Sequence, residues 1–108
     1  MRRTTYKIDR NKWAKLSFAE QMGNISSEVG RSFKYQKNDD KKMADDALTH
    51  AIDLLDATSS GLAKKHSYRA KEVLRAKEEY LNAFYENKDQ AGIEKYFNQF
   101  AIAARIGR

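Results

Sequence analysis

Side chains that could bind a metal are few in this chain. It has two histidines and no cysteine, too few nitrogen and sulfur ligands for a closed zinc site. Asp46 and His50 are spaced i, i+4 and share one face of a helix, where they could hold a cation, but two ligands do not complete a site. The Glu-x-x-His pairs of di-iron bundles do not occur. We therefore expect no metal and no cofactor.

Motifs for catalysis are also missing from the sequence. None of the seven serines lies in a Gly-x-Ser-x-Gly pattern, and neither glycine-rich phosphate-binding motif occurs. Glu78 and Glu79 are neighbours, but adjacent residues point about 100° apart on a helix and do not form a carboxylate pair. The sequence predicts a protein that is not an enzyme.

Positive charge is the chemistry that the sequence offers in quantity. There are 21 Lys and Arg against 15 Asp and Glu, a net charge of +6. The cations concentrate in residues 1–16, in residues 64–75 and in the tail with Arg105 and Arg108. Such a surface favours a polyanion. We expect phosphate contacts, with little reading of base sequence, from Arg2, Arg3, Lys7, Arg10, Lys12, Lys64, Lys65, Arg69, Lys71 and Arg75.

Two aromatic residues, Tyr6 and Trp13, interrupt the basic N-terminal segment. Aromatic rings beside cations can stack on unpaired bases. Alternatively, Trp13 and Leu16 close the apolar end of a helical core. The sequence leaves both interpretations open.

Four helices are predicted to position these charges. The first begins at Ser17, which forms a capping box with Glu20, and carries an apolar stripe at helical spacing: Phe18, Met22, Ile25, Val29 and Phe33. The second begins near Asp39 or Asp40. It is expected to end at Ser59-Ser60-Gly61, with Gly61 in the left-handed conformation.

The third helix is predicted to run from about His66 to Glu86, and Asp89 can cap the fourth. We expect Val73, Leu74, Leu81 and Phe84 to be buried in the third helix, with Tyr68, Tyr80 and Tyr85 flanking them. Short connections make successive helices antiparallel neighbours. The predicted fold is all-α: a basic arm over residues 1–16, then an antiparallel up-down-up-down four-helix bundle over residues 17–108. This threading brings the basic segments to one end.

Two further surfaces have alternative interpretations. Glycine inside a helix costs roughly 1 kcal/mol relative to alanine, so the small-residue stripe with Gly23, Ser27 and Gly30 indicates close approach of another backbone. That backbone belongs either to the same chain or to a second subunit. The acidic second helix, with Asp45 and Asp53, is either a solvated face or a contact with another copy.

The stretches "KWAKLSFAEQMGNISSEVGR" and "EKYFNQFAIAARIGR" resemble the two ends of small bacterial four-helix bundle proteins. In size, charge and helix layout the chain is similar to the accessory variability proteins of diversity-generating retroelements. The resemblance implies a basic, ring-forming homo-oligomer, commonly a pentamer, that binds structured RNA and a reverse transcriptase. The acidic second helix departs from an all-round basic barrel. A protein-interaction adaptor without a nucleic-acid role is the alternative.

The chain contains no apolar run of the roughly 20 residues that a membrane span needs. Its basic N-terminus is not followed by the apolar segment of a secretory signal. We expect a cytoplasmic protein with no membrane partner.

Overall fold

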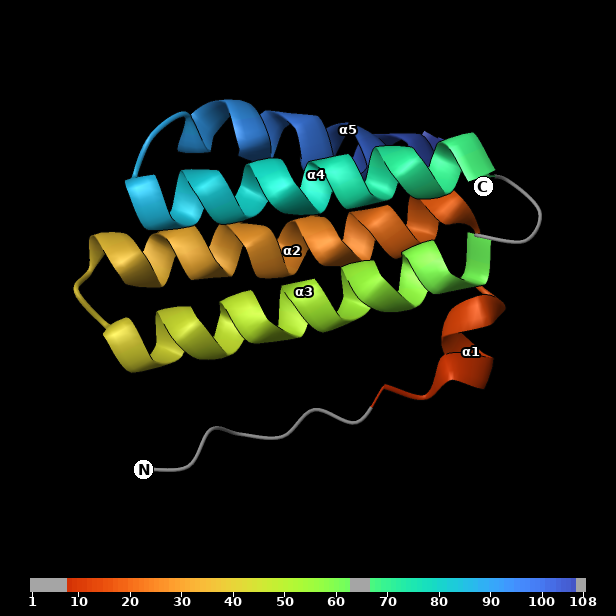
Figure 1. The fold of residues 1–108 in the computed structure, drawn as a ribbon, viewed down its shortest axis with the longest axis horizontal. Helices are drawn as coiled ribbons and strands as arrows, with labels where there is room; N and C mark the ends of the chain where they lie inside the picture. Colours follow the sequence, from red (N-terminus) through yellow and green to blue (C-terminus); the bar gives the residue numbers. More distant parts are fainter. Residues whose placement is uncertain (1–7, 63–66, 107–108) are drawn as a thin grey trace.

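The chain is all-helical in a computed structural model (Figure 1). The structure describes residues 8–62 and 67–106, and this part contains no strand. The expected all-α class is confirmed. Where four helices are predicted, the described residues form five: α1 (Arg10–Ala14), α2 (Phe18–Lys37), α3 (Lys41–Leu62), α4 (Ser67–Glu86) and α5 (Gln90–Ile106). The additional helix, α1, lies within the basic segment 1–16.

The start and the buried face of α2 agree with the sequence pattern. The Ser17 side chain accepts a hydrogen bond from the Glu20 amide, and the Glu20 carboxylate accepts one from the Ser17 amide, so the capping box is confirmed. Four of the five stripe residues are fully buried, and Phe18 packs against them at the edge of the core. The local signals were sufficient here because the cap and the stripe lie on one helix.

The helix α3 starts as predicted but continues further. Asp40 accepts a hydrogen bond from the Met43 amide at 3.2 Å and caps the first turn. The predicted left-handed end at Gly61 is wrong: no described glycine has a positive φ, and α3 runs through Gly61 to Leu62. Leu62 packs against the core, and this apolar contact favours continuation of the helix through Gly61.

The buried face of α4 is rotated from the predicted one. Val73 and Phe84 are buried as expected, but Leu74 is 49% exposed and Tyr80 is fully buried. Burial of Tyr80 is possible because its hydroxyl lies 2.6 Å from the Ser32 hydroxyl. Ser32 already donates to the Val29 carbonyl, so the Tyr80 O–H donates to Ser32. The Tyr80 hydroxyl, which favours an exposed position, thus has its hydrogen-bond partner inside the core.

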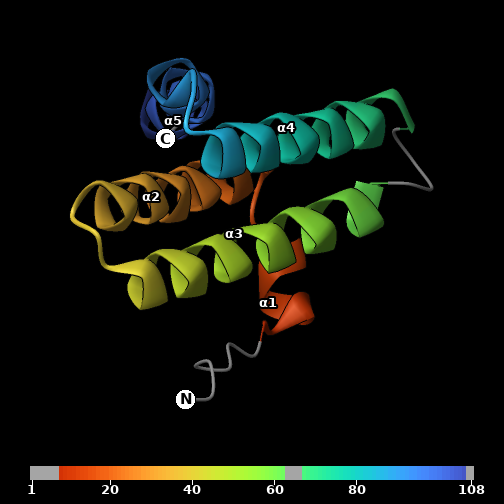
Figure 2. The ribbon, with the colours of Figure 1, turned by 60° about the vertical axis from the view of Figure 1, so that its left-hand side comes forward.

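The helix α2 is central to the packing. It lies along both α3 and α5, whereas α4 packs mainly against α3 and touches α5 less. Figure 2 shows α5 almost end-on while α3 and α4 are seen from the side, so α5 is inclined to these two helices. The core therefore centres on α2 residues, including Met22 and Ile25, together with Leu55 of α3 and Phe97 of α5.

Aromatic rings form a continuous ladder through the molecule. Successive ring centroids are 5.2 to 6.4 Å apart, most of them in edge-to-face geometry, the arrangement that aromatic quadrupoles prefer. The ladder links three of the four long helices, α2, α4 and α5, and contains no residue of α3. Its members, in order, are Phe18, Phe100, Tyr96, Phe97, Tyr80, Phe33, Phe84 and Tyr85.

Candidate nucleic-acid interface

The described parts of the basic segments meet at one end of the helices, on the right in Figure 1. Here α2 and α4 begin and α3 and α5 end. Arg69 of α4 lies over the Phe18 ring at the start of α2, with its guanidinium carbon 4.2 Å from the ring centroid. We call this end the basic pole, and its described cations are Arg10, Lys12, Lys15, Arg69, Lys71 and Arg105.

Two clefts connect the remaining segments to the same end. Arg10 of α1 lines one cleft together with Gln21 near the start of α2 and Gly61 near the end of α3. Arg105 of α5 lines another with Gly23, which lies in the second turn of α2. One cleft thus places α1 beside the end of α3, and the other places the last described turn of α5 beside α2.

The cations of the pole differ in how far carboxylates neutralise them. Arg10, Lys12 and Lys15 are exposed, and none of them forms an ion pair within the described residues. Arg69 lies beside Glu72, with Nη1 to Oε1 at 3.6 Å. Three exposed cations without an ion pair therefore lie close together on α1 and the residue that follows it.

Arg75 lies apart from the pole, about two turns into α4. Its Nε is 3.5 Å from Glu79 Oε2. The side chain is highly exposed, so this i, i+4 pair contributes little to stability and leaves Arg75 accessible. Lys71, one turn earlier on the helix, is exposed and has no ion pair among the described residues.

The helix α1 is held against the core by two hydrogen bonds at Trp13. The Trp13 indole N–H donates to the Thr58 hydroxyl at 3.0 Å, and Thr58 is 1% exposed. Gln21 donates to the Trp13 carbonyl at 2.8 Å. Asp9 caps the helix by accepting from the amides of Asn11 and Lys12. Trp13 also packs against the hydrophobic core, as the interpretation of it as an apolar closure predicts.

Several predicted site residues lie outside the described part of the chain. These are Arg2, Arg3, Lys7, Lys64 and Lys65. Their expected contacts with RNA stay predictions. In sequence, Arg2, Arg3 and Lys7 precede α1, and Lys64 and Lys65 lie between the end of α3 and the start of α4.

The small-residue stripe packs within the same chain at one of its positions. A Cβ on Gly23 would lie 3.0 Å from the Ala101 Cα of α5, so α2 and α5 approach closely there. Gly30 is looser: the nearest atom to its Cβ position is Glu94 Oε1, at 3.8 Å. Ser27 lines the same α2–α5 groove. Close approach at Gly23 is explained without a second subunit.

The acidic surface of α3 is smaller than the sequence indicates. Asp56 forms an ion pair with Lys77 of α4, with Nζ 2.7 Å from Oδ1. Asp46 is buried, and its Oδ2 lies 4.0 Å from Lys42 Nζ. Asp45 and Asp53 remain without an ion pair among the described residues. The contact of these two carboxylates with another copy stays a prediction.

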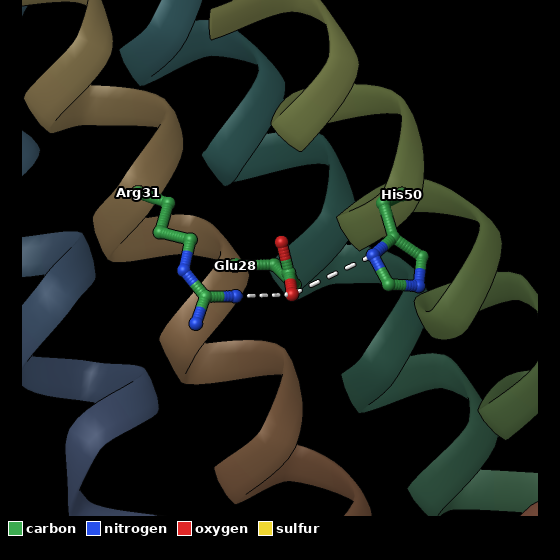
Figure 3. A network of polar contacts seen from close by, with 3 residues as sticks. All are labelled: Glu28, Arg31 and His50. Carbon is green, nitrogen blue, oxygen red and sulfur yellow. Dashed lines mark hydrogen bonds and ion pairs between the residues drawn. The ribbon is translucent and has the colours of Figure 1, made fainter. Parts of the chain in front are cut away.

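A polar network joins α2 to α3 near the middle of both helices (Figure 3). Glu28 Oε2 accepts from Arg31 Nη1 at 2.7 Å and lies 3.5 Å from His50 Nδ1. His50 thus faces Glu28, while Asp46, its predicted partner for a cation, contacts Lys42. Over residues 8–62 and 67–106, no three His, Asp or Glu side chains are grouped in a way that could hold a metal ion.

Tyr96 of α5, which contacts α4, has a raised pKa. The Tyr96 hydroxyl donates to Glu72 Oε2 at 3.2 Å. Burial and the adjacent Glu72 carboxylate raise the pKa of Tyr96 from 10.0 to about 12. The phenol therefore stays neutral near neutral pH and helps to hold α5 against α4. This geometry supports packing and suggests no proton transfer.

Comparison with known proteins gives no relative for this chain. No protein-family model, curated protein or solved structure matches it. None of the helices in the described regions has the length and apolar character to cross a membrane.

The sequence missed two features of this site. Asp9 followed by a helix-forming segment was the signal for α1, and it could have been recognised as an N-cap. The contact between Trp13 and Thr58 joins residues that are far apart in sequence and had no local signal.

Proposed function

We propose that this protein is a non-enzymatic RNA-binding accessory protein with the topology of an antiparallel four-helix bundle. The observation that carries the proposal is the set of exposed cations on and beside α1, which have no carboxylate partner in the described chain. The chain has a net charge of +6, and cations without carboxylate partners attract phosphate at long range. When they bind RNA, counterions are released from its phosphates. The resemblance to accessory variability proteins adds a reverse transcriptase as protein partner and a homo-oligomer as the assembly.

The proposal predicts that RNA binding depends on where the charge lies. The triple charge reversal Arg10→Glu, Lys12→Glu and Lys15→Glu removes three cations of the pole. A matched control reverses three exposed lysines at the opposite end, where α2 ends and α3 begins: Lys34, Lys37 and Lys41. Both variants change the net charge equally, so long-range attraction is reduced alike and only the local contacts differ.

The measurement is the affinity for a single-stranded RNA oligonucleotide as a function of salt concentration. Each phosphate contact contributes about 0.7 to the slope of log K against log salt for single strands, so losing three contacts lowers the slope by about 2. The control variant is expected to keep most of the slope. Equal slopes and affinities for both variants would reject the pole as the RNA site. Helical circular dichroism checks that both variants fold.

The reverse-transcriptase part is tested separately. The retroelement enzyme and its template RNA are assayed for cDNA synthesis with the wild-type protein and with the pole variant. The proposal expects stimulation by the wild type only. Stimulation that survives the charge reversal would favour a protein-interaction adaptor.

One observation favours that adaptor as a second candidate. The helix α4 exposes Tyr68 by 72%, Leu74 by 49% and Tyr85 by 71%. Exposed aromatic residues are enriched at protein interfaces. Substituting these three by Ser, with the pole unchanged, separates the two functions: loss of partner capture with intact RNA binding would assign α4 to the protein partner.

A further inference from the structure

The fold-back of α1 creates a cleft that no local sequence pattern indicates. Its upper wall is the segment that enters and forms α1, with Lys12 and Trp13, and its floor is formed by Asn24 of α2 and by His50 and Leu54 of α3. It has a volume of about 360 Å³, within the range of small-molecule sites. Leu54 is 6% exposed, so the cleft reaches the edge of the core.

The walls of the cleft combine an apolar surface with a few polar groups. Ile8, Trp13 and Leu16 are partly buried and supply the apolar part together with Leu54. Asn24 is exposed, and its amide makes no hydrogen bond within the described residues. A primary amide both donates and accepts, which matches the edge of a nucleobase.

Two sets of hydrogen bonds hold the α1 wall of this cleft. The hydrogen bond from Trp13 to Thr58 holds the indole ring at its place in the wall. Glu28 Oε2 lies 3.5 Å from the His50 Nδ1 (Figure 3). The Asp9 carboxylate at the rim accepts from two α1 amides, so it is engaged in capping. The α1 wall is thereby held in place without a ligand, which lowers the cost of binding.

The charge around the cleft indicates what kind of ligand enters it. Lys12 lines the cleft itself, while Arg10 and Lys15 lie on the same short segment, and none of the three has a carboxylate partner in the described chain. A ligand with an aromatic heterocycle and a neighbouring phosphate satisfies both the apolar wall and the cations. Single-stranded RNA has this composition, whereas in a duplex the bases are paired and stacked.

We propose that this cleft receives one unpaired base of a single-stranded RNA whose phosphates lie along the cations of α1. The inference rests on the proposed function and adds that the protein distinguishes single strands from duplexes. Stacking and edge contacts to one base account for the preference, since the phosphate contacts are common to both forms.

The first test compares a single-stranded RNA oligonucleotide with the duplex of the same sequence at equal salt. A base held by an aromatic residue is expected to make the single strand bind about fivefold to a hundredfold more tightly. The emission of Trp13, the only tryptophan, should change with the single strand and not with the duplex. Equal affinity for both forms overturns the inference.

The second test substitutes the amide. Asn24→Ala should weaken single-strand binding by about three- to tenfold, as loss of one hydrogen bond does, and leave duplex binding unchanged. Asn98→Ala is the matched control, because Asn98 is exposed and lines the groove between α2 and α5. Asn24 is on the surface, so a folding defect is not expected, and circular dichroism verifies this.

The outcomes separate this inference from the function on which it rests. If the triple charge reversal abolishes binding while Asn24→Ala binds both RNA forms like the wild type, the base cleft is rejected and the RNA-binding function stands. If neither RNA form binds at all, both are rejected. A selective loss of single-strand affinity in Asn24→Ala, absent from Asn98→Ala, supports both.

Discussion

Replacing glycine by alanine at two positions of α2 measures how closely α5 approaches it. Gly23 and Gly30 both lie inside the helix, where alanine is favoured over glycine by about 1 kcal/mol. The surroundings differ. At Gly23 the added Cβ meets the Ala101 Cα at 3.0 Å, a backbone atom that cannot rotate away, whereas at Gly30 only Glu94 Oε1 lies near, at 3.8 Å.

The expected magnitudes follow from these two environments. Gly30→Ala gains the helix propensity without a clash and raises the free energy of unfolding by about 0.5–1 kcal/mol. Gly23→Ala gains the same propensity but pushes α5 outward, and overpacking of this kind costs about 1–3 kcal/mol. It is therefore expected to be less stable than Gly30→Ala by about 1–3 kcal/mol.

The assay is urea unfolding of both variants and the wild type, followed by circular dichroism at several protein concentrations. In a chain of this size 1 kcal/mol corresponds to about 4–8 °C in Tm, so thermal unfolding gives an independent value. The reasoning is refuted if both alanines stabilise equally. If the defect of Gly23→Ala grows on dilution, the contact lies between subunits and not between α2 and α5 of one chain.

Two further predictions concern the buried phenols. Ser32→Ala should lower the free energy of unfolding by about 1–3 kcal/mol, because it leaves the buried Tyr80 hydroxyl without an acceptor. Tyr80→Phe should lower it by about 1 kcal/mol, since Ser32 still donates to Val29. Urea unfolding measures both values, and the reverse order would contradict the assigned donor. Burial raises the pKa values of Tyr80 and Tyr96, so the neutral phenols are favoured in the folded state. The resulting stability is complete below pH about 10 and is lost as the pH rises through about 12. Unfolding curves across this range measure the loss, and Tyr96→Phe should make stability depend less on pH. An increase in stability at alkaline pH would contradict the prediction.

The sequence predicted those parts of the fold that depend on residues close together in the chain. The capping box at Ser17 and Glu20 is a local interaction of four residues, and it is present. The continuation of α3 through Gly61 to Leu62 could not be predicted, since it depends on whether Leu62 packs against the core. Tyr80 was misplaced for the same reason: its acceptor, Ser32, is on another helix.

The candidate site was predictable to the extent that charge placement determines it. The described parts of the basic segments lie at one end of the helices in Figure 1, while the antiparallel four-helix topology stays a prediction. Which cations stay unneutralised could not be predicted, because Arg69 and Arg75 are reached by carboxylates of their own helix through rotamers that the sequence does not specify. The cleft under α1 requires a contact between Trp13 and Thr58 and had no signal at all.

The aromatic ladder has a consequence for internal motion. A phenol ring flips about its Cβ–Cγ axis, and the hydroxyl lies on that axis, so Tyr80 can keep its bond to Ser32 while the ring turns. What resists the flip is the packing of Phe33 and Phe97 against the ring edges. Tyr85, at the exposed end, has no such restraint on most of its surface. Ring resonances in NMR spectra should therefore be averaged for Tyr85 and slowed for Tyr80, in a gradient from the surface to the centre of the molecule.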